Sequence, residues 1–212
     1  MKVDRDLYRI NLSRYTILAF QLLPAMKKPR ILDIGCGTGV PTIKLAELCD
    51  GEIIGIDSDK RSLAKLNHKI AESNLSGRVR TIYCHIDNLP FDNERFDILW
   101  AEGSISFVGF ERGITEWRRL LRREGYLVIH DELSNYQAKI RSVEENDYTL
   151  EAFFKLTESV WWNEYYRHLD QLLDGIRSSE CSGEVDRIRK ELEIFKTKPE
   201  SVQSAFFVLK KI

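Results

Sequence analysis

Ile31-Leu32-Asp33-Ile34-Gly35-Cys36-Gly37-Thr38-Gly39-Val40 is the stretch that decides the fold of this chain. Its first four residues are mostly apolar and predict a buried strand, and three glycines at alternate positions follow at once. Pro41 then stands where the first turn of a helix tolerates proline, and an apolar stripe predicts a helix over 41–48. A strand, a glycine turn and a helix in this order bring backbone close to a cofactor in an α/β sheet.

The spacing of the glycines indicates which class of cofactor the turn serves. Dinucleotide-binding turns space their glycines as G-x-G-x-x-G, whereas this turn reads D-x-G-x-G-x-G with Asp33 inside the strand. The pattern resembles the first motif of class I S-adenosylmethionine-dependent methyltransferases. The resemblance implies that the turn wraps the amino-acid part of S-adenosylmethionine and that Asp33 helps to hold its ammonium group. The cofactor contacts implied here are Asp33, Gly35, Cys36, Gly37, Thr38 and Gly39. The alternative is a tight turn needed only for packing.

Composition limits the class of protein. At 212 residues the chain fits one domain, and its 43% hydrophobic content with a net charge of -1 argues against disorder and against a basic nucleic-acid-binding surface. No apolar stretch is long enough to span a bilayer, and the charged N-terminus is unlike a signal peptide. Four cysteines far apart (Cys36, Cys49, Cys84 and Cys181) predict reduced thiols, a cytoplasmic protein and no metal site.

Strand and helix patterns alternate along the chain. Strands are predicted at 31–34, 52–57, 79–84, 96–101, 126–130, 151–156 and 205–209, and helices at 5–23, 41–48, 60–74, 109–122 and 135–145. Two further amphipathic helices, joined near Gly175 and Gly183, predict a helical hairpin at about 160–196. We expect one α/β domain over 1–212, with an N-terminal helix or lid at 1–24, a cofactor-binding core at 25–132 and a C-terminal part at 133–212. Its sheet is expected to be Rossmann-like and doubly wound, with seven strands, the last one antiparallel, and helices on both faces, as in the methyltransferases.

An acid ends the second predicted strand. Asp57 lies about twenty residues beyond the glycines, where a carboxylate suits the two ribose hydroxyls of a nucleoside. Ser58 is a further cofactor candidate, although it or Asp59 can instead cap the helix at 60–74.

The loop after the third strand carries a second resemblance. Cys84-His85-Ile86-Asp87-Asn88-Leu89-Pro90-Phe91 is similar to the G-D-A-x-x-L-P-F block of ubiquinone/menaquinone-type methyltransferases. It departs from that block where Cys84 replaces glycine and His85 replaces aspartate. The resemblance implies that His85, Ile86 and Asp87 hold adenine, while an ordinary loop histidine remains the alternative for His85.

The strand ends that face the ligand side supply the candidates for chemistry. Glu102 follows the fourth strand, and we count it both as a cofactor contact and, with His130 at the end of the fifth strand, as a catalytic candidate. His130 is the candidate general base because an unperturbed histidine titrates near neutrality, although methyl transfer can need only alignment of the reacting atoms. Residues 102–107 and 161–166 are expected to shape the acceptor site, with Trp161 and Tyr166 lying off the core stripe of their helix.

The sequence thus predicts an enzyme that transfers a methyl group from S-adenosylmethionine to a small molecule and releases S-adenosylhomocysteine. The glycine spacing disfavours an oxidoreductase. A non-catalytic S-adenosylmethionine-binding or partner-binding protein on the same fold stays open. Methylation of protein or RNA is disfavoured by the balanced charge and by the absence of an Asn/Asp-Pro-Pro-Tyr/Phe motif after the fourth strand. No nucleic-acid partner and no membrane span are expected, and a homodimer is left open.

Overall fold

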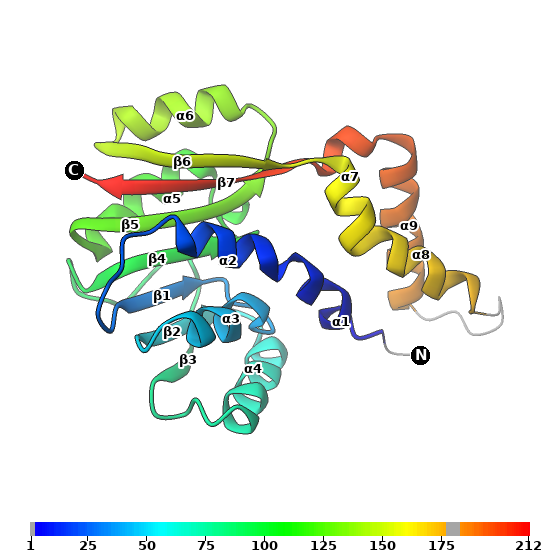
Figure 1. Cartoon of the computed structure of the whole chain (residues 1–212), viewed down its shortest axis with the longest axis horizontal. Coiled ribbons are helices and arrows are strands. Elements are labelled where there is room, and N and C mark those ends of the chain that lie inside the picture. The colour runs from blue at the N-terminus through cyan, green and yellow to red at the C-terminus, as the bar shows by residue number, and fades with distance from the viewer. Residues whose placement is uncertain (1–2, 177–182) are drawn as a thin grey trace.

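A single mixed sheet organises the chain in a computed structural model, which describes residues 3–176 and 183–212 (Figure 1). Within these residues seven strands lie in the order β3-β2-β1-β4-β5-β7-β6. They are β1 (Arg30–Ile34), β2 (Glu52–Asp57), β3 (Val79–Tyr83), β4 (Phe96–Glu102), β5 (Leu121–Glu132), β6 (Tyr148–Leu156) and β7 (Ser204–Lys211). β7 runs antiparallel to both of its neighbours, and the pairs among β1 to β5 are parallel. The predicted doubly wound sheet with an antiparallel last strand is confirmed.

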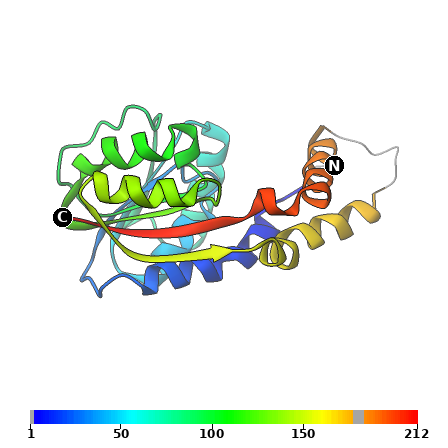
Figure 2. The same ribbon diagram turned by 90° about the horizontal axis from the view of Figure 1, so that it is seen from above.

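Helices cover both faces of the sheet, and each face has its own apolar core (Figure 2). One face packs against α2 (Ser13–Gln21), α3 (Val40–Leu48) and α4 (Lys60–Glu72), and the other against α5 (Phe110–Trp117) and α6 (Tyr136–Glu145). The strands β1, β2 and β4 are buried along nearly their whole length, as a parallel sheet covered on both sides requires.

A helical arm projects from one end of the sheet, beyond β6 and before β7 (Figures 1 and 2). It comprises α7 (Glu158–Trp161), the π-helical turn η4 (Trp162–Tyr166), α8 (Arg167–Asp174) and α9 (Gly183–Thr197). Its core, a third apolar cluster, also contains Val3, and Tyr8 and Leu12 pack against it. The N-terminal segment and the arm therefore bury their apolar side chains together. α8 and α9 lie where the hairpin is predicted. The segment that connects them, which includes Cys181, lies outside the described residues.

Two predicted helices differ from the structure. The N-terminal helix expected over 5–23 is broken into α1 (Asp6–Arg9), the 3-10 turn η1 (Ile10–Leu12) and α2. The helix expected over 109–122 ends at Trp117, and β5 begins earlier than predicted, at Leu121. Leu121 is fully buried opposite Phe96, so the demand for burial in the sheet overrides the helical pattern there.

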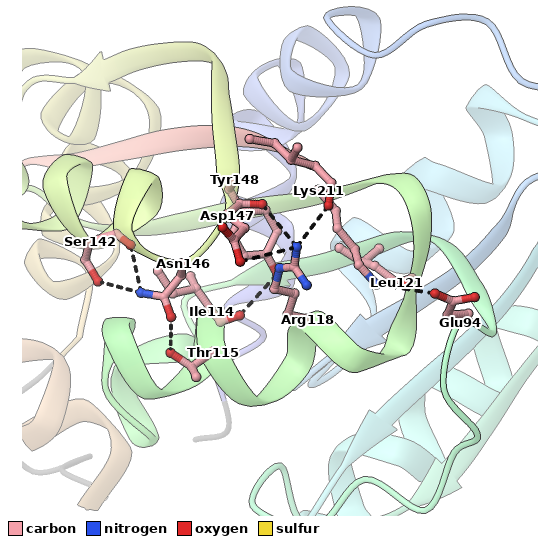
Figure 3. A network of polar contacts seen from close by, with 11 residues as sticks. Glu94, Ile114, Thr115, Arg118, Leu121, Ser142, Asn146, Asp147, Tyr148 and Lys211 are labelled. Atoms are coloured by element: carbon pink, nitrogen blue, oxygen red, sulfur yellow. Dashed lines mark hydrogen bonds and ion pairs between the residues drawn. The ribbon is translucent and has the colours of Figure 1, made fainter.

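A polar network fastens the far end of β7, away from the arm (Figure 3). Lys211 is only 7% exposed, and its Nζ donates to the carbonyl of Leu121 at 2.6 Å. Arg118 donates to the Ile212 carbonyl at 2.9 Å and lies 3.8 Å from a carboxylate oxygen of Asp147. These contacts hold the last strand between β5 and β6.

The turn after β1 requires glycine for its backbone conformation and, at Gly35 and Gly39, also for close packing. Gly35, Gly37 and Gly39 have φ values of +73°, +52° and +82°. A Cβ on Gly35 would lie 2.4 Å from the Cβ of Ser104, and one on Gly39 would lie 2.1 Å from Cδ1 of Leu66. Glycine is needed here both for the left-handed backbone and for the close approach of neighbouring elements.

None of the described helices is long and apolar enough to cross a membrane.

Gly39→Ala should lower the free energy of unfolding by about 1–3 kcal/mol, because it adds a side chain in a left-handed conformation against Leu66. Urea denaturation monitored by circular dichroism measures the change. Gly77→Ala is the matched control, since nothing lies within 4 Å of its Cβ position. Equal stability of the two variants would contradict this account of the turn.

Candidate functional site

A cavity of about 640 Å³ lies at the carboxyl ends of β1, β4 and β5, bounded also by the N-terminal segment and the arm. From the sheet its lining includes Asp33, Gly35–Gly39, Glu102, Gly103, Ser106, Phe107, His130, Asp131 and Glu132. The N-terminal segment contributes Arg5, Arg9, Leu12, Ser13, Tyr15 and Thr16, and the arm with β7 contributes Trp161, Tyr165, Tyr166, Glu191, Ser204 and Phe206. Ligands of open α/β sheets bind at this edge.

The glycine turn is fixed to the end of β2. The N–H of Gly37 donates to Oδ2 of Asp57 at 2.8 Å, and Ile56 accepts hydrogen bonds from the N–H groups of Gly35 and Cys36 at 2.9 Å each. Oδ1 of Asp57 accepts from the N–H of Asp59 at 2.7 Å. Each oxygen of Asp57 retains a lone pair for a ribose hydroxyl.

Asp59, rather than Ser58, is the residue that caps α4. Its carboxylate accepts from the N–H of Arg61 at 2.9 Å at the start of α4, while Ser58 is exposed.

Two carboxyl groups meet behind the turn. Asp33 is 1% exposed and accepts a hydrogen bond from the hydroxyl of Thr42 at 2.5 Å. Burial raises the pKa of Asp33 to about 7, with a smaller contribution from the charge of Asp57. Glu102 accepts from Nε1 of Trp100 at 2.8 Å, and burial also raises its pKa to about 7. A cationic ligand would favour the ionised form of both acids.

The N-terminal segment is tied across the turn. The carboxylate of Asp6 accepts from the Thr38 hydroxyl at 2.7 Å and from Nζ of Lys69 at 2.8 Å. Lys69 also donates to the Thr38 carbonyl at 3.0 Å. One residue earlier, Arg5 pairs with Glu191 of the arm at 2.8 Å. The segment therefore bridges the glycine turn and the arm.

His130 stands between the sheet and the arm. It lies opposite Glu102 in the β4–β5 register, and its Nε2 shares a hydrogen bond of 2.7 Å with Oγ of Ser204. Nε1 of Trp161 donates to the same oxygen at 3.0 Å, which leaves the serine proton available to His130. Its ring stacks on Phe206 with the ring centres 4.4 Å apart. Burial lowers the pKa of His130 to about 4, so the ring is neutral near pH 7.

Aromatic side chains form the wall on the arm side. Trp161, Tyr165 and Tyr166 line the cavity together. Tyr166, expected to lie off the core stripe, is also buried with Tyr165 in the apolar core of the arm. The π-helical turn η4 accounts for this, because its wider turn presents positions 161, 165 and 166 on one side. Phe107, 83% exposed, stands at the mouth of the cavity.

The predicted adenine loop lies outside the cavity lining. His85 and Asp87 are exposed, and Asp87 pairs with Arg112 at 3.1 Å. Ile86 packs against the apolar core. Asp57 and Ser58 are also absent from the lining, although the N–H of Cys84 donates to the Asp57 carbonyl at 3.1 Å and so places this loop beside Asp57.

The N-terminal contributors to the lining were missed by sequence reasoning. Residues 5–23 show only an amphipathic pattern, and no motif marks Ser13 or Thr16 as facing a site. Ser13 and Thr16 are only 6% and 2% exposed, and this burial of polar side chains beside the cavity becomes evident only in the packed structure.

Part of the chain is similar to known methyltransferases. Residues 31–125 match a family model described as "Methyltransferase domain". The 27-O-demethylrifamycin SV methyltransferase of Amycolatopsis mediterranei is 31% identical over 111 residues, covering 52% of this chain and 41% of that protein. The chain thus spans less than half the length of this curated relative.

Solved structures share the fold over nearly the whole chain. An S-adenosylmethionine-dependent methyltransferase from Thiobacillus denitrificans, in complex with S-adenosylhomocysteine, aligns over 100% of both chains with a TM-score of 0.74 and 16% identity. The [4+2]-cyclase SpnF aligns over 94% of this chain and 80% of its own with a TM-score of 0.80 and 20% identity. At these identities the likeness shows the fold. A methyltransferase domain is thus matched over residues 31–125, and the fold is shared with an S-adenosylmethionine-dependent methyltransferase over the whole chain.

Proposed function

We propose that this protein binds S-adenosylmethionine and transfers its methyl group to a hydroxyl group of an apolar, ring-containing small molecule. The C–O bond forms as the methyl–sulfur bond breaks, S-adenosylhomocysteine leaves, and the hydroxyl proton is released to solvent. One observation carries the proposal: a glycine turn backed by the buried Asp33 and the half-buried Glu102 opens into the same cavity as an aromatic wall with a neutral histidine. The first half suits a cationic nucleoside cofactor, and the second suits an apolar acceptor.

The residues present fit the cofactor. Three of the five residues in the turn at 35–39 are glycines that line the cavity, Asp57 has free lone pairs for ribose, and the loop at 85–87 adjoins Asp57. Asp33 and Glu102 supply negative charge for an ammonium and a sulfonium group. When bound, S-adenosylmethionine supplies a methyl group activated by its attachment to positive sulfur.

The acceptor side supports alignment rather than strong base catalysis. His130 is neutral, and Ser204 and Trp161 fix its ring, so it can hydrogen-bond an acceptor hydroxyl. Its lowered pKa makes it a weak base, so we assign it an orienting role in place of the general base that the sequence suggests. Trp161, Tyr165 and Tyr166 exclude water from the acceptor. The rifamycin-modifying relative supports a small-molecule acceptor.

S-adenosylmethionine at millimolar concentration should raise the melting temperature of the wild-type protein, and Asp57→Ala should abolish this rise. The substitution removes both the ribose ligand and the hydrogen bond that orders Gly37. Differential scanning fluorimetry gives the readout. Asp59→Ala, which removes the α4 cap, should lower stability by about 1 kcal/mol and keep the ligand-induced rise. A wild-type protein that is folded and shows no rise would refute the cofactor assignment.

Affinity for S-adenosylmethionine should increase about threefold to tenfold from pH 6 to pH 7.5. In the free protein Asp33 and Glu102 carry protons until about pH 7, and binding a cation favours their ionised forms, so binding releases protons below that pH. Isothermal titration calorimetry measures the dissociation constant at each pH. Glu102→Gln should weaken binding and flatten its pH dependence, whereas Glu116→Gln, an exposed carboxyl paired with Arg112, should leave both unchanged. Affinity that falls as pH rises would contradict this assignment of charge.

Incubation with S-adenosylmethionine labelled in the methyl group should transfer label to hydroxylated aromatic or polyketide-type compounds from a metabolite extract. Mass spectrometry identifies the labelled product, and Asp57→Ala is the inactive control. Conversion of an acceptor without label would instead indicate another reaction on this fold, as for the [4+2]-cyclase. Cofactor binding with no labelled product from any extract would favour the non-catalytic alternative.

A further inference from the structure

The buried face of α2 changes character where it reaches the cavity. Ala19, on this face, is fully buried in the apolar core beneath the sheet, as is Leu23 just beyond the helix. One and two turns earlier along the same face stand Thr16 and Ser13, which are 2% and 6% exposed and line the cavity. Polar groups buried on a packing face need hydrogen-bond partners.

Only one of these two hydroxyl groups has a partner. Thr16 hydrogen-bonds the carboxyl group of Glu102. Oγ of Ser13 is buried and, among the described residues, has no hydrogen-bond partner. An orphaned hydroxyl destabilises the unliganded protein, and Ser13 is also a lining residue of the cavity.

A cation lies four residues before Ser13, at the end of α1 and across the 3-10 turn η1. Arg9 lines the cavity, hydrogen-bonds the Tyr165 hydroxyl, and forms no ion pair with the described residues. The other arginine of the lining, Arg5, is already paired with Glu191. Along the N-terminal segment the order is therefore a cation at Arg9, an unpartnered hydroxyl at Ser13, and Thr16 bound to the acid Glu102.

This order matches the two charges of an amino-acid group. We propose that Ser13, assisted by Arg9, binds the α-carboxylate of the methionyl part of S-adenosylmethionine, while Glu102 and Asp33 face its ammonium group. The inference rests on the proposed function, because it needs S-adenosylmethionine as the ligand. It makes the N-terminal segment a wall of the cofactor site, in addition to the turn and strand ends that the sequence marks.

Two probes that differ only in the carboxylate test the proposal: S-adenosylmethionine and decarboxylated S-adenosylmethionine. Calorimetry gives the dissociation constant of each for the wild type, Ser13→Ala and Arg9→Gln. Ser13→Ala should weaken S-adenosylmethionine about tenfold, as loss of one hydrogen bond to a charged group does, and weaken the decarboxylated probe less than twofold. Arg9→Gln should show the same selectivity for the probe with the carboxylate.

Stability of the unliganded protein separates a binding role from a structural one. Removal of the orphaned hydroxyl in Ser13→Ala should leave the melting temperature unchanged or raise it. Ser142→Ala is the matched control: it removes a buried helical hydroxyl outside the cavity lining and should leave both affinities unchanged. Unchanged affinity in Ser13→Ala, or equal losses for both probes, would overturn the proposal while leaving the proposed function intact. Failure of the wild type to bind either probe would instead refute the proposed function.

Discussion

The hydrogen bond from the N–H of Gly37 to the carboxylate of Asp57 holds together the part of the molecule on which the site depends. It joins the ends of two neighbouring parallel strands, so the turn between β1 and α3 cannot move independently of β2. Ser104 packs so close to Gly35, and Leu66 so close to Gly39, that a Cβ atom at either glycine would clash. Backbone, rather than side chains, is thereby presented to the ligand, in a conformation set before any ligand arrives.

The cavity combines two parts of different origin. Strand ends and the glycine turn build the part with the two acids, where hydrogen bonds from Thr42 and Trp100 offset part of the cost of burial and a positive ligand would offset more. The arm builds the aromatic part, around a histidine whose ring is held by Ser204 and Phe206. The N-terminal segment connects the two through Asp6 on one side and Arg5 on the other. Rearrangement of this segment would affect both parts together.

The central features of the fold follow from the sequence because they are local. The strand at 31–34, the alternating glycines and the acid at Asp57 each leave a pattern within a few residues. The role of Ser13 leaves none, because its significance lies in burial against residues far away in the chain. The early start of β5 was missed for a related reason: Leu121 is fixed by pairing with Phe96, which a helical periodicity cannot reveal.

The pKa values of the site residues were also outside the reach of sequence reasoning. An isolated histidine has a pKa near neutrality and suggests a base. Burial among aromatic rings lowers the pKa of His130 to about 4, so its imidazole ring is neutral near pH 7. Glu102 and Asp33 change in the opposite sense for the same physical cause, burial without a cation.

The π-helical turn in the arm determines how the aromatic wall of the cavity would respond to a change in chain length. An α-helix rotates by about 100° per residue, so insertion or loss of one residue turns everything beyond it to a new face. At η4 such a change would re-aim Tyr165 and Tyr166 relative to Trp161 without altering any residue of the glycine turn. A single codon gained or lost in the arm would therefore reshape the aromatic wall of the cavity while the sequence of the glycine turn stays the same.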